Sequence, residues 1–242
     1  MPKYDTFTWE RSERWVRGVK GGTTVVDSPH PVLVREPGAH GPRYAFPKQE
    51  VRTDLLRPSN NPPSGATDDR QYYDLAVDGA VVANAAWRYP DDKLAGHIAF
   101  AWFGPAGTVL DHWYEEDEEV YAVPRDPYHR VDPIRGARHV KVEHNGQVVA
   151  ETERPILLFE TGIPVRYYIP PEDVNFDLLE PTELSTGCPY KGFASYWSFR
   201  AGGSEVAWAY LDPIASVASI KGYVSFYDNA VDITVDKVES SS

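Results

Sequence analysis

Residues 188–192 contain the side chains of this sequence that are best suited to nucleophilic or anion-binding chemistry. Cys188 is the only thiol, and Lys191 follows three residues later in the loop Cys-Pro-Tyr-Lys-Gly. A nearby ammonium lowers the pKa of a thiol and favours the nucleophilic thiolate. Lys191, assisted by the backbone amide of Gly192, is also a candidate for binding an anion or phosphate. The structural alternative is a small buried cysteine beside a solvent-exposed lysine in a glycine turn.

Glu160 is the candidate for proton transfer. It follows the apolar run Pro155-Ile-Leu-Leu-Phe159, so we expect its carboxyl near the core, where burial raises the pKa of a carboxyl towards the range useful for acid–base catalysis. A matching glutamate, Glu36, occurs in the first half of the chain without the Cys-Lys loop. This recurrence favours a structural alternative, in which the glutamates pair with Arg166 and Arg43.

One arginine and several aromatic residues complete the candidate site. The residues that we expect to line a cleft for an anionic or planar metabolite are Arg166, Tyr168, Tyr190, Trp208 and Tyr210. The enzymatic interpretation assigns Lys191 to anion binding, Glu160 to proton transfer and Cys188 to nucleophilic attack. The alternative for the aromatic group is a place in the core, with the hydroxyls satisfied at its margin.

Several common activities have no motif in this sequence. The P-loop, dinucleotide-binding, nucleophile-elbow, HExxH and CxxC patterns are absent. The seven histidines lack metal-ligand spacing, so no metal site is predicted and the cofactor stays unknown. A nucleotidyltransferase holds Mg²⁺ with paired carboxylates. The pair Asp91-Asp92 corresponds to Leu211-Asp212 in the second half, which argues against that activity.

The composition is that of an acidic globular protein. Of its 242 residues, 42% are hydrophobic and 25% are charged, as in ordinary folded domains. The net charge of −12 would repel a phosphate backbone, so no nucleic acid partner is expected. No apolar stretch reaches about 18 residues, which predicts no membrane partner. A single cysteine forms no disulfide within the chain, and we expect a cytoplasmic location.

The elements that must position these side chains occur twice. Residues 43–59 align with residues 166–182 without a gap, and eight of the 17 positions are identical. Three further blocks match in the same order: Pro31, Leu33 and Glu36 with Pro155, Leu157 and Glu160; Ala86-Trp87-x-Tyr89 with Ala207-Trp208-x-Tyr210; and Gly96-x-Ile98-x-Phe100 with Gly222-x-Val224-x-Phe226. Such self-similarity indicates a tandem repeat.

The repeat predicts a domain organisation. We expect a first, diverged β repeat at residues 1–110, an acidic and proline-containing connector at 111–135, and a second β repeat with the intact motif at 136–242. The connector includes the acidic run 115–119, expected as a solvated face. Apolar side chains flank this run, so we expect the connector to pack on the repeats and the repeats to pack within the chain.

Turn and strand signals predict a mainly β fold. Four hairpins are indicated, with turns at Asp78-Gly79, Asn145-Gly146, Gly202-Gly203 and Asp228-Asn229, the last between strands at 221–227 and 231–238. Helical signals are confined to residues 11–16 and 171–179. The prediction is two tandem homologous small antiparallel β domains, as sandwiches or partly rolled sheets, with few short helices.

An ordered set of motifs runs through the second half of the chain. They are Glu160, Arg166-Tyr-Tyr-Ile-Pro170, Asp173-Val174, Cys188-Pro-Tyr-Lys-Gly192 with Tyr196, Ala207-Trp208-x-Tyr210 and Gly222-Tyr-Val-Ser-Phe226. Together they resemble domain-of-unknown-function family 427, labelled nucleotidyltransferase-like in some classifications. The segment 124–132 is similar to the connector of its tandem two-copy members.

The two repeats differ at the motif that could carry chemistry. The first repeat has residues 60–69, with neither thiol nor lysine, in place of the Cys-Lys loop. We therefore predict a small-molecule site in the second repeat, for an anionic or planar metabolite, and leave open whether the protein is an enzyme. The alternatives are a non-catalytic interaction module and, less favoured, a nucleotidyltransferase.

Overall fold

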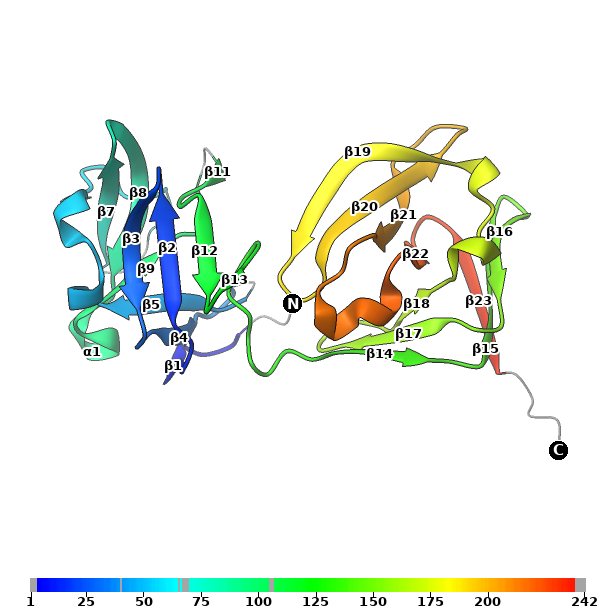
Figure 1. Cartoon of the computed structure of the whole chain (residues 1–242), viewed down its shortest axis with the longest axis horizontal. Helices are drawn as coiled ribbons and strands as arrows, with labels where there is room; N and C mark the ends of the chain where they lie inside the picture. The colour runs from blue at the N-terminus through cyan, green and yellow to red at the C-terminus, as the bar shows by residue number, and fades with distance from the viewer. Residues whose placement is uncertain (1–3, 40, 65, 67–69, 105–106, 238–242) are drawn as a thin grey trace. The chain divides into compact units, whose positions relative to one another are not determined.

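The computed structural model of the chain describes residues 4–39, 41–64, 66, 70–104 and 107–237. The chain divides into two compact units, which we call the first unit, up to Asp126, and the second unit, from Pro127 onwards. Both consist mainly of antiparallel strands, with short helical turns between them (Figure 1). The prediction of a mainly β fold is confirmed.

The first unit contains two main sheets and one short strand pair. Its strands are β1 Thr8–Arg11, β2 Val16–Lys20, β3 Thr23–Ser28, β4 Val32–Arg35, β5 Arg43–Pro47, β6 Leu56–Pro58, β7 Gln71–Val77, β8 Ala80–Arg88, β9 His97–Phe100, β10 Phe103–Gly104, β11 Gly107–Thr108, β12 His112–Glu115 and β13 Glu118–Glu119. Its helical segments are η1 Lys48–Glu50, η2 Thr53–Leu55 and α1 Asp91–Leu94.

The second unit is built from the following elements. Its strands are β14 Val131–Arg135, β15 Arg138–His144, β16 Gln147–Thr152, β17 Ile156–Glu160, β18 Arg166–Tyr168, β19 Leu179–Cys188, β20 Gly192–Phe199, β21 Glu205–Tyr210, β22 Val224–Phe226 and β23 Asp232–Lys237. Its helical segments are the 3₁₀ turns η3 Pro171–Asp173, η4 Phe176–Leu178 and η5 Ala215–Ile220.

The two units share one strand order. The long sheet of the first unit runs β1-β4-β5-β9-β8-β7-β6. In the second unit, reciprocal backbone hydrogen bonds between Ile169 and Val224, at 2.8 and 2.9 Å, join β14-β17-β18 to the sheet β22-β21-β20-β19. The smaller sheets correspond as well, β3-β2-β12 in one unit and β16-β15-β23 in the other. The sequence repeat is therefore also a repeat of topology.

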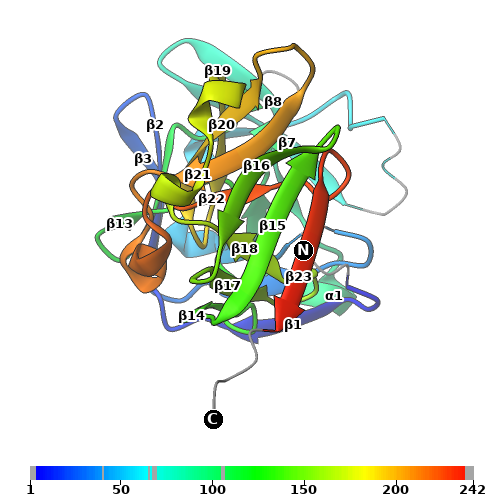
Figure 2. The same ribbon diagram turned by 90° about the vertical axis from the view of Figure 1, so that its right-hand side faces the viewer.

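The long sheet of the second unit is apolar on both faces. Ala207 and Ala209 belong to a core cluster with Val140 and Val142 of β15, so this face packs against the smaller sheet that Figure 2 shows in front. Because side chains alternate along a strand, Trp208 of β21 belongs instead to a second cluster, which includes residues of η5. The candidate side chains lie on this second face.

Three of the four predicted hairpins are confirmed. The turns Asp78-Gly79 and Asn145-Gly146 have positive φ at both residues, as the tight hairpin turn requires, and β20 pairs with β21 across Gly202-Gly203. The fourth prediction is wrong, because β22 pairs with β21 whereas β23 pairs with β15. Every residue of β22 is buried, as suits a strand inside the long sheet, so Asp228-Asn229 connects two sheets.

The helical predictions are corrected in part. Residues 11–16 form no helix, since Arg11 ends β1 and Val16 begins β2. Residues 171–179 contain two separate 3₁₀ turns, because Asn175 between them has a non-helical backbone, with φ −82° and ψ 84°, and its side chain accepts a hydrogen bond from the amide of Asp177.

The expected connector contributes strands to both units. Residues 112–115 form β12 beside β2, and residues 131–135 form β14 beside β17. The acidic run is not solvated throughout, because Glu115 is only 4% exposed and accepts a hydrogen bond from Tyr44 at 2.8 Å. Arg125 also binds its carboxylate, at 3.1 Å. This glutamate therefore stabilises the first unit from inside.

Candidate functional site

The second unit contains a small pocket on the outer face of its long sheet. Its volume is about 170 Å³, and its lining residues are Leu158, Glu160, Ile163, Arg166, Tyr168, Lys191, Tyr196, Trp208, Tyr210 and Tyr227. Half of them are aromatic and three are charged. The pocket thus combines flat apolar walls with a few polar groups, as ligand sites in proteins commonly do.

The strand register explains why these side chains meet. Arg166 and Tyr168 are two residues apart on β18, and Trp208 and Tyr210 are two apart on β21, so each pair projects from one face of its strand. Glu160 ends β17, the neighbour of β18. Strands distant in the sequence therefore direct the candidate residues to one place.

The loop that carries Lys191 is closed by a glycine. Gly192 has φ +96°, in the region that favours glycine, and a Cβ there would lie 3.3 Å from the carbonyl oxygen of Asp212. The amide of Lys191 donates to the carbonyl of Cys188 at 3.3 Å. This tight turn sends the Lys191 side chain inwards, where the residue is only 7% exposed. The alternative of a solvent-exposed lysine is therefore wrong.

Glu160 is held by two basic side chains. The Lys191 ammonium donates to its Oε2, and Nε2 of His129 lies 3.0 Å from its Oε1. Burial favours the neutral acid, but the charge of Lys191 and the hydrogen bonds from Lys191 and His129 outweigh it, so the pKa of Glu160 is lowered. The expectation of a raised pKa is thus wrong, because the ion pair keeps this carboxyl ionised.

Arg166 does not pair with Glu160. Its guanidinium contacts Asp228 at 3.2 Å, and the Asp228 side chain is 63% exposed. It also lies 5.8 Å from the ring centre of Trp208. The predicted ion pair forms only in the first unit, where Nε of Arg43 donates to Glu36 at 3.0 Å. Arg166 therefore gives the pocket a positive group whose partner is solvent-exposed.

The tyrosine hydroxyls of the pocket differ in their hydrogen bonding. The Tyr168 hydroxyl accepts a bond from the Trp208 indole at 3.1 Å, and the Tyr196 hydroxyl lies 2.6 Å from Oγ1 of Thr186. The Tyr210 hydroxyl makes no hydrogen bond to any residue that the structure describes. Burial, followed by the charge of Cys188, raises the pKa of Tyr210. Its hydroxyl therefore stays protonated and can donate to a ligand.

Two of the sequence-predicted residues lie outside the pocket lining. Cys188 is a half-buried free thiol, packed at the edge of the cluster that contains Tyr168. Tyr190 is buried, and its ring stacks on His129 with centres 4.2 Å apart. The Lys191 ammonium binds Glu160 rather than the thiol, so the nucleophilic role of Cys188 remains a prediction.

The site contains residues that the sequence does not indicate, among them His129, Leu158 and Ile163. His129 contacts Glu160, which lies 31 positions later in the sequence. It belongs to the segment that we expected to be part of the connector. Tyr196 is one of the aromatic residues that the sequence offers for lining a cleft, and it lines the pocket. Tyr227 follows the last repeated motif and is not indicated. Burial, followed by the charge of Tyr196, raises the pKa of Tyr227 to about 12. The sequence signal for His129, Tyr196 and Tyr227 is that each lies within or next to a quoted family motif.

The part of the chain that the structure describes offers neither a metal centre nor a membrane-spanning helix. There, no group of three or more His, Cys, Asp or Glu side chains could hold a metal ion. None of the helices there has the length and apolar character needed to cross a membrane.

A family model matches the chain twice. It is described as a domain of unknown function (DUF427), and it matches residues 8–116 and again residues 132–237. One matched segment falls in each structural unit. Among curated proteins, none matches this chain.

Proposed function

The chain belongs to domain-of-unknown-function family 427, in a form with two copies, and we propose that it is a small-molecule-binding protein whose site is the pocket of the second unit. The proposed occupant is a compact, planar, anionic metabolite. The observation that carries this proposal is the meeting, between aromatic walls, of Arg166 and the Tyr210 hydroxyl, which is bonded to no residue that the structure describes. The proposed compartment is the cytosol, as the single cysteine suggests.

The size of the pocket favours a small ligand. Sites for drug-sized molecules measure about 300–1,000 Å³, whereas this one measures about 170 Å³. A single ring with one acidic substituent suits this volume better than a nucleotide does. The surrounding tyrosine and tryptophan rings favour a flat group, since aromatic faces pack closely against other planar systems.

The charges favour an anion. Lys191 and Glu160 neutralise each other within the lining, which leaves Arg166 as the cation available to a ligand. Its present partner, Asp228, is largely exposed, and exposed ion pairs contribute little, about 0–1 kcal/mol. A ligand carboxylate can therefore replace Asp228 at small cost and form a two-pronged contact with the guanidinium.

The state of Glu160 supports binding rather than acid catalysis. Both of its oxygens are occupied by Lys191 and His129, and its pKa is lowered. A general acid at neutral pH needs a raised pKa instead. In this proposal, Glu160 is the counter-charge that keeps the Lys191 ammonium in the lining of the pocket.

Benzoate tests the proposal, with neutral benzamide as its uncharged counterpart. A ligand that binds only the folded protein raises its melting temperature, so we expect benzoate to shift the melting of the wild type and benzamide to shift it less. Arg166→Gln should remove most of the shift. Arg130→Gln is the matched control, because Arg130 forms an exposed ion pair with Asp132 in the same unit. Equal shifts in wild type and Arg166→Gln would refute the site.

A further inference from the structure

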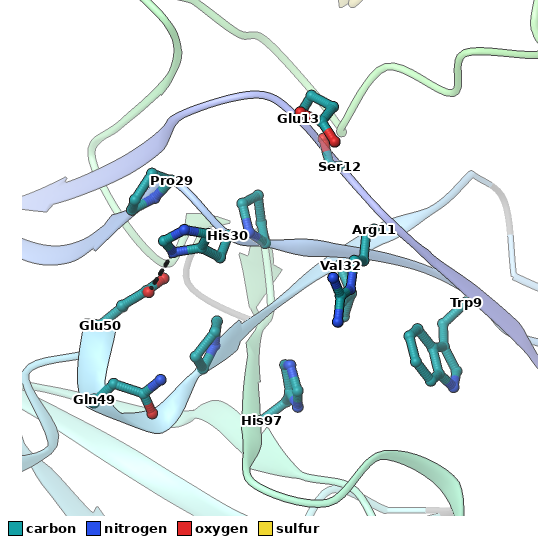
Figure 3. A pocket seen from close by; sticks show the side chains of 12 residues that line it. Trp9, Arg11, Ser12, Glu13, Pro29, His30, Val32, Gln49, Glu50 and His97 are labelled. Atoms are coloured by element: carbon teal, nitrogen blue, oxygen red, sulfur yellow. Dashed lines mark hydrogen bonds and ion pairs between the residues drawn. The ribbon is translucent and has the colours of Figure 1, made fainter.

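The first unit contains a pocket of its own, which shares no lining residue with the pocket of the second unit. Its volume is about 520 Å³, within the range of about 300–1,000 Å³ of ligand sites. Figure 3 shows its side chains: Trp9 and Arg11 on one side, His97 between them and Gln49 at the bottom of the view, and His30 with Glu50 on the other side. This pocket accommodates a larger molecule than the one in the second unit.

The strand register brings three of these side chains to one face. Trp9 and Arg11 are two residues apart on β1, so they project in the same direction. Arg11 lies opposite Val32 of β4, whose buried side chain forms part of the pocket wall. His97 begins β9 and lies opposite Pro47 of β5. The wall is therefore built on paired strands and not on a loose loop.

The carboxylate of Glu50, on the acidic side of the pocket, already has hydrogen-bond partners within the first unit. Glu50 accepts a hydrogen bond from Ser28 at 2.5 Å and contacts His30 at 2.8 Å. Glu13 stands with Ser12 at the opposite rim from His97 (Figure 3). Glu50 is therefore hydrogen-bonded, and Glu13 lies away from the side of the pocket that carries Trp9.

The basic side of the pocket is open. Arg11 is exposed and has no ion pair or hydrogen bond from its side chain to any residue that the structure describes. Nδ1 of His97 lies 2.8 Å from the carbonyl oxygen of Ala95 and so donates to it, which makes Nε2 of the neutral ring an acceptor and leaves Arg11 as the group that binds an anion. Trp9 is 47% exposed, a large apolar ring beside these two polar groups. Such an aromatic surface next to an unpaired guanidinium suits a flat acid.

In the second unit, a proline stands where the first unit has Trp9. Trp9 pairs with Val34 of β4, and at the corresponding place Pro133 pairs with Leu158 of β17. The pocket is therefore a feature of the first copy, the one without the Cys-Lys loop. We propose that the first unit binds a planar aromatic carboxylate or phosphate ester, its ring stacked on Trp9 and its acidic group bound by Arg11.

The probe for this site is 2-naphthoate, a two-ring acid, with neutral 2-naphthamide as its counterpart. In calorimetric titrations of the full chain, we expect naphthoate to bind at least about tenfold more tightly than naphthamide, the ratio that one charge-assisted hydrogen bond gives. Equal affinity of the two compounds, or no binding of naphthoate, would overturn the proposal.

Exposed residues allow substitutions that leave the fold intact. Trp9→Ala and Arg11→Gln should each weaken naphthoate binding at least about tenfold. The controls are Trp15→Ala and Arg57→Gln, because Trp15 is similarly exposed and neither residue lines the pocket. Loss of binding in Arg166→Gln with retention in Arg11→Gln would assign naphthoate to the second unit and overturn this proposal, while leaving the benzoate result unaffected.

Discussion

The two units bury a glutamate at the same position of the long sheet, but they neutralise it with different side chains. In the first unit, Glu36 is 7% exposed and accepts hydrogen bonds from Arg43 at 3.0 Å and Tyr89 at 2.7 Å. Arg70 forms an ion pair with it at 2.9 Å. In the second unit, the corresponding Glu160 has neither arginine and is bound by a lysine and a histidine instead.

This difference decides whether the space over the neighbouring rings is filled. The guanidinium of Arg70 lies 5.5 Å from the ring centre of Trp87 and 5.1 Å from that of Tyr89. The matching rings in the second unit, Trp208 and Tyr210, line the pocket. In the first unit, the flat guanidinium of Arg70 therefore occupies the space over the rings of Trp87 and Tyr89. In the second unit, the corresponding space is a pocket with room for a planar ligand.

The largest effect is expected from removing the lysine. Lys191→Met leaves Glu160 buried with only His129, and loss of one member of a buried pair costs about 3–5 kcal/mol. Amide hydrogen exchange reports each unit separately, so protection of β15 should fall while that of β2 is unchanged. The double variant Lys191→Met with Glu160→Gln should restore much of the protection. Unchanged exchange in the single variant would contradict the dependence of the second unit on this pair.

Acid breaks the same pair reversibly. Because the pKa of Glu160 is lowered in the folded protein, its stabilising contribution is complete above the pKa of an unfolded glutamate, about 4.3, and is lost as the pH falls from there through the folded pKa. The free energy of unfolding of the second unit should therefore decrease over this range. Glu160→Gln should flatten the decrease, and a curve of unchanged slope in that variant would assign it to other groups.

Some features of the two units follow from local sequence chemistry, and others depend on the fold. The turns Asp78-Gly79 and Asn145-Gly146 were predictable because the need for positive φ is local chemistry. The sequence indicates both Glu160 and Lys191, but their contact spans 31 residues and depends on the strand order. Residue chemistry therefore indicated the members of the site, and only the fold gave their partners.

The ion pair of Arg70 with Glu36 could not be predicted from the alignment of the repeats. Arg70 lies two residues before Tyr72, which pairs with Trp87, whereas Ala194 lies two residues before Tyr196, which pairs with Trp208. Arg70 thus corresponds to Ala194 and not to Lys191. An alignment of the repeats records the lost lysine but cannot reveal that a guanidinium from another strand position reaches the same glutamate.

A smaller effect is expected from emptying the space in the first unit. Arg70→Ala should cost about 1.5–3 kcal/mol, the contribution of a hydrogen bond to a charged group, because Glu36 keeps Arg43 and Tyr89. Methylguanidinium should bind the cavity and raise the melting temperature of the variant more than that of the wild type. Methylammonium is the control, since it lacks the flat group. Equal response of the variant and the wild type would show that the rings do not hold the guanidinium.

The smallest effect comes from a matched pair of hydroxyl deletions. Tyr89→Phe removes a donor from the buried Glu36 and should cost about 1.5 kcal/mol. Tyr210→Phe removes a hydroxyl that is bonded to no described residue, so the second unit should lose less than about 0.5 kcal/mol. The same substitution should nevertheless weaken benzoate binding, because the hydroxyl is the donor facing the pocket. A costly Tyr210→Phe with unchanged benzoate affinity would mean that this hydroxyl serves the fold, and that the two units use the tyrosine alike.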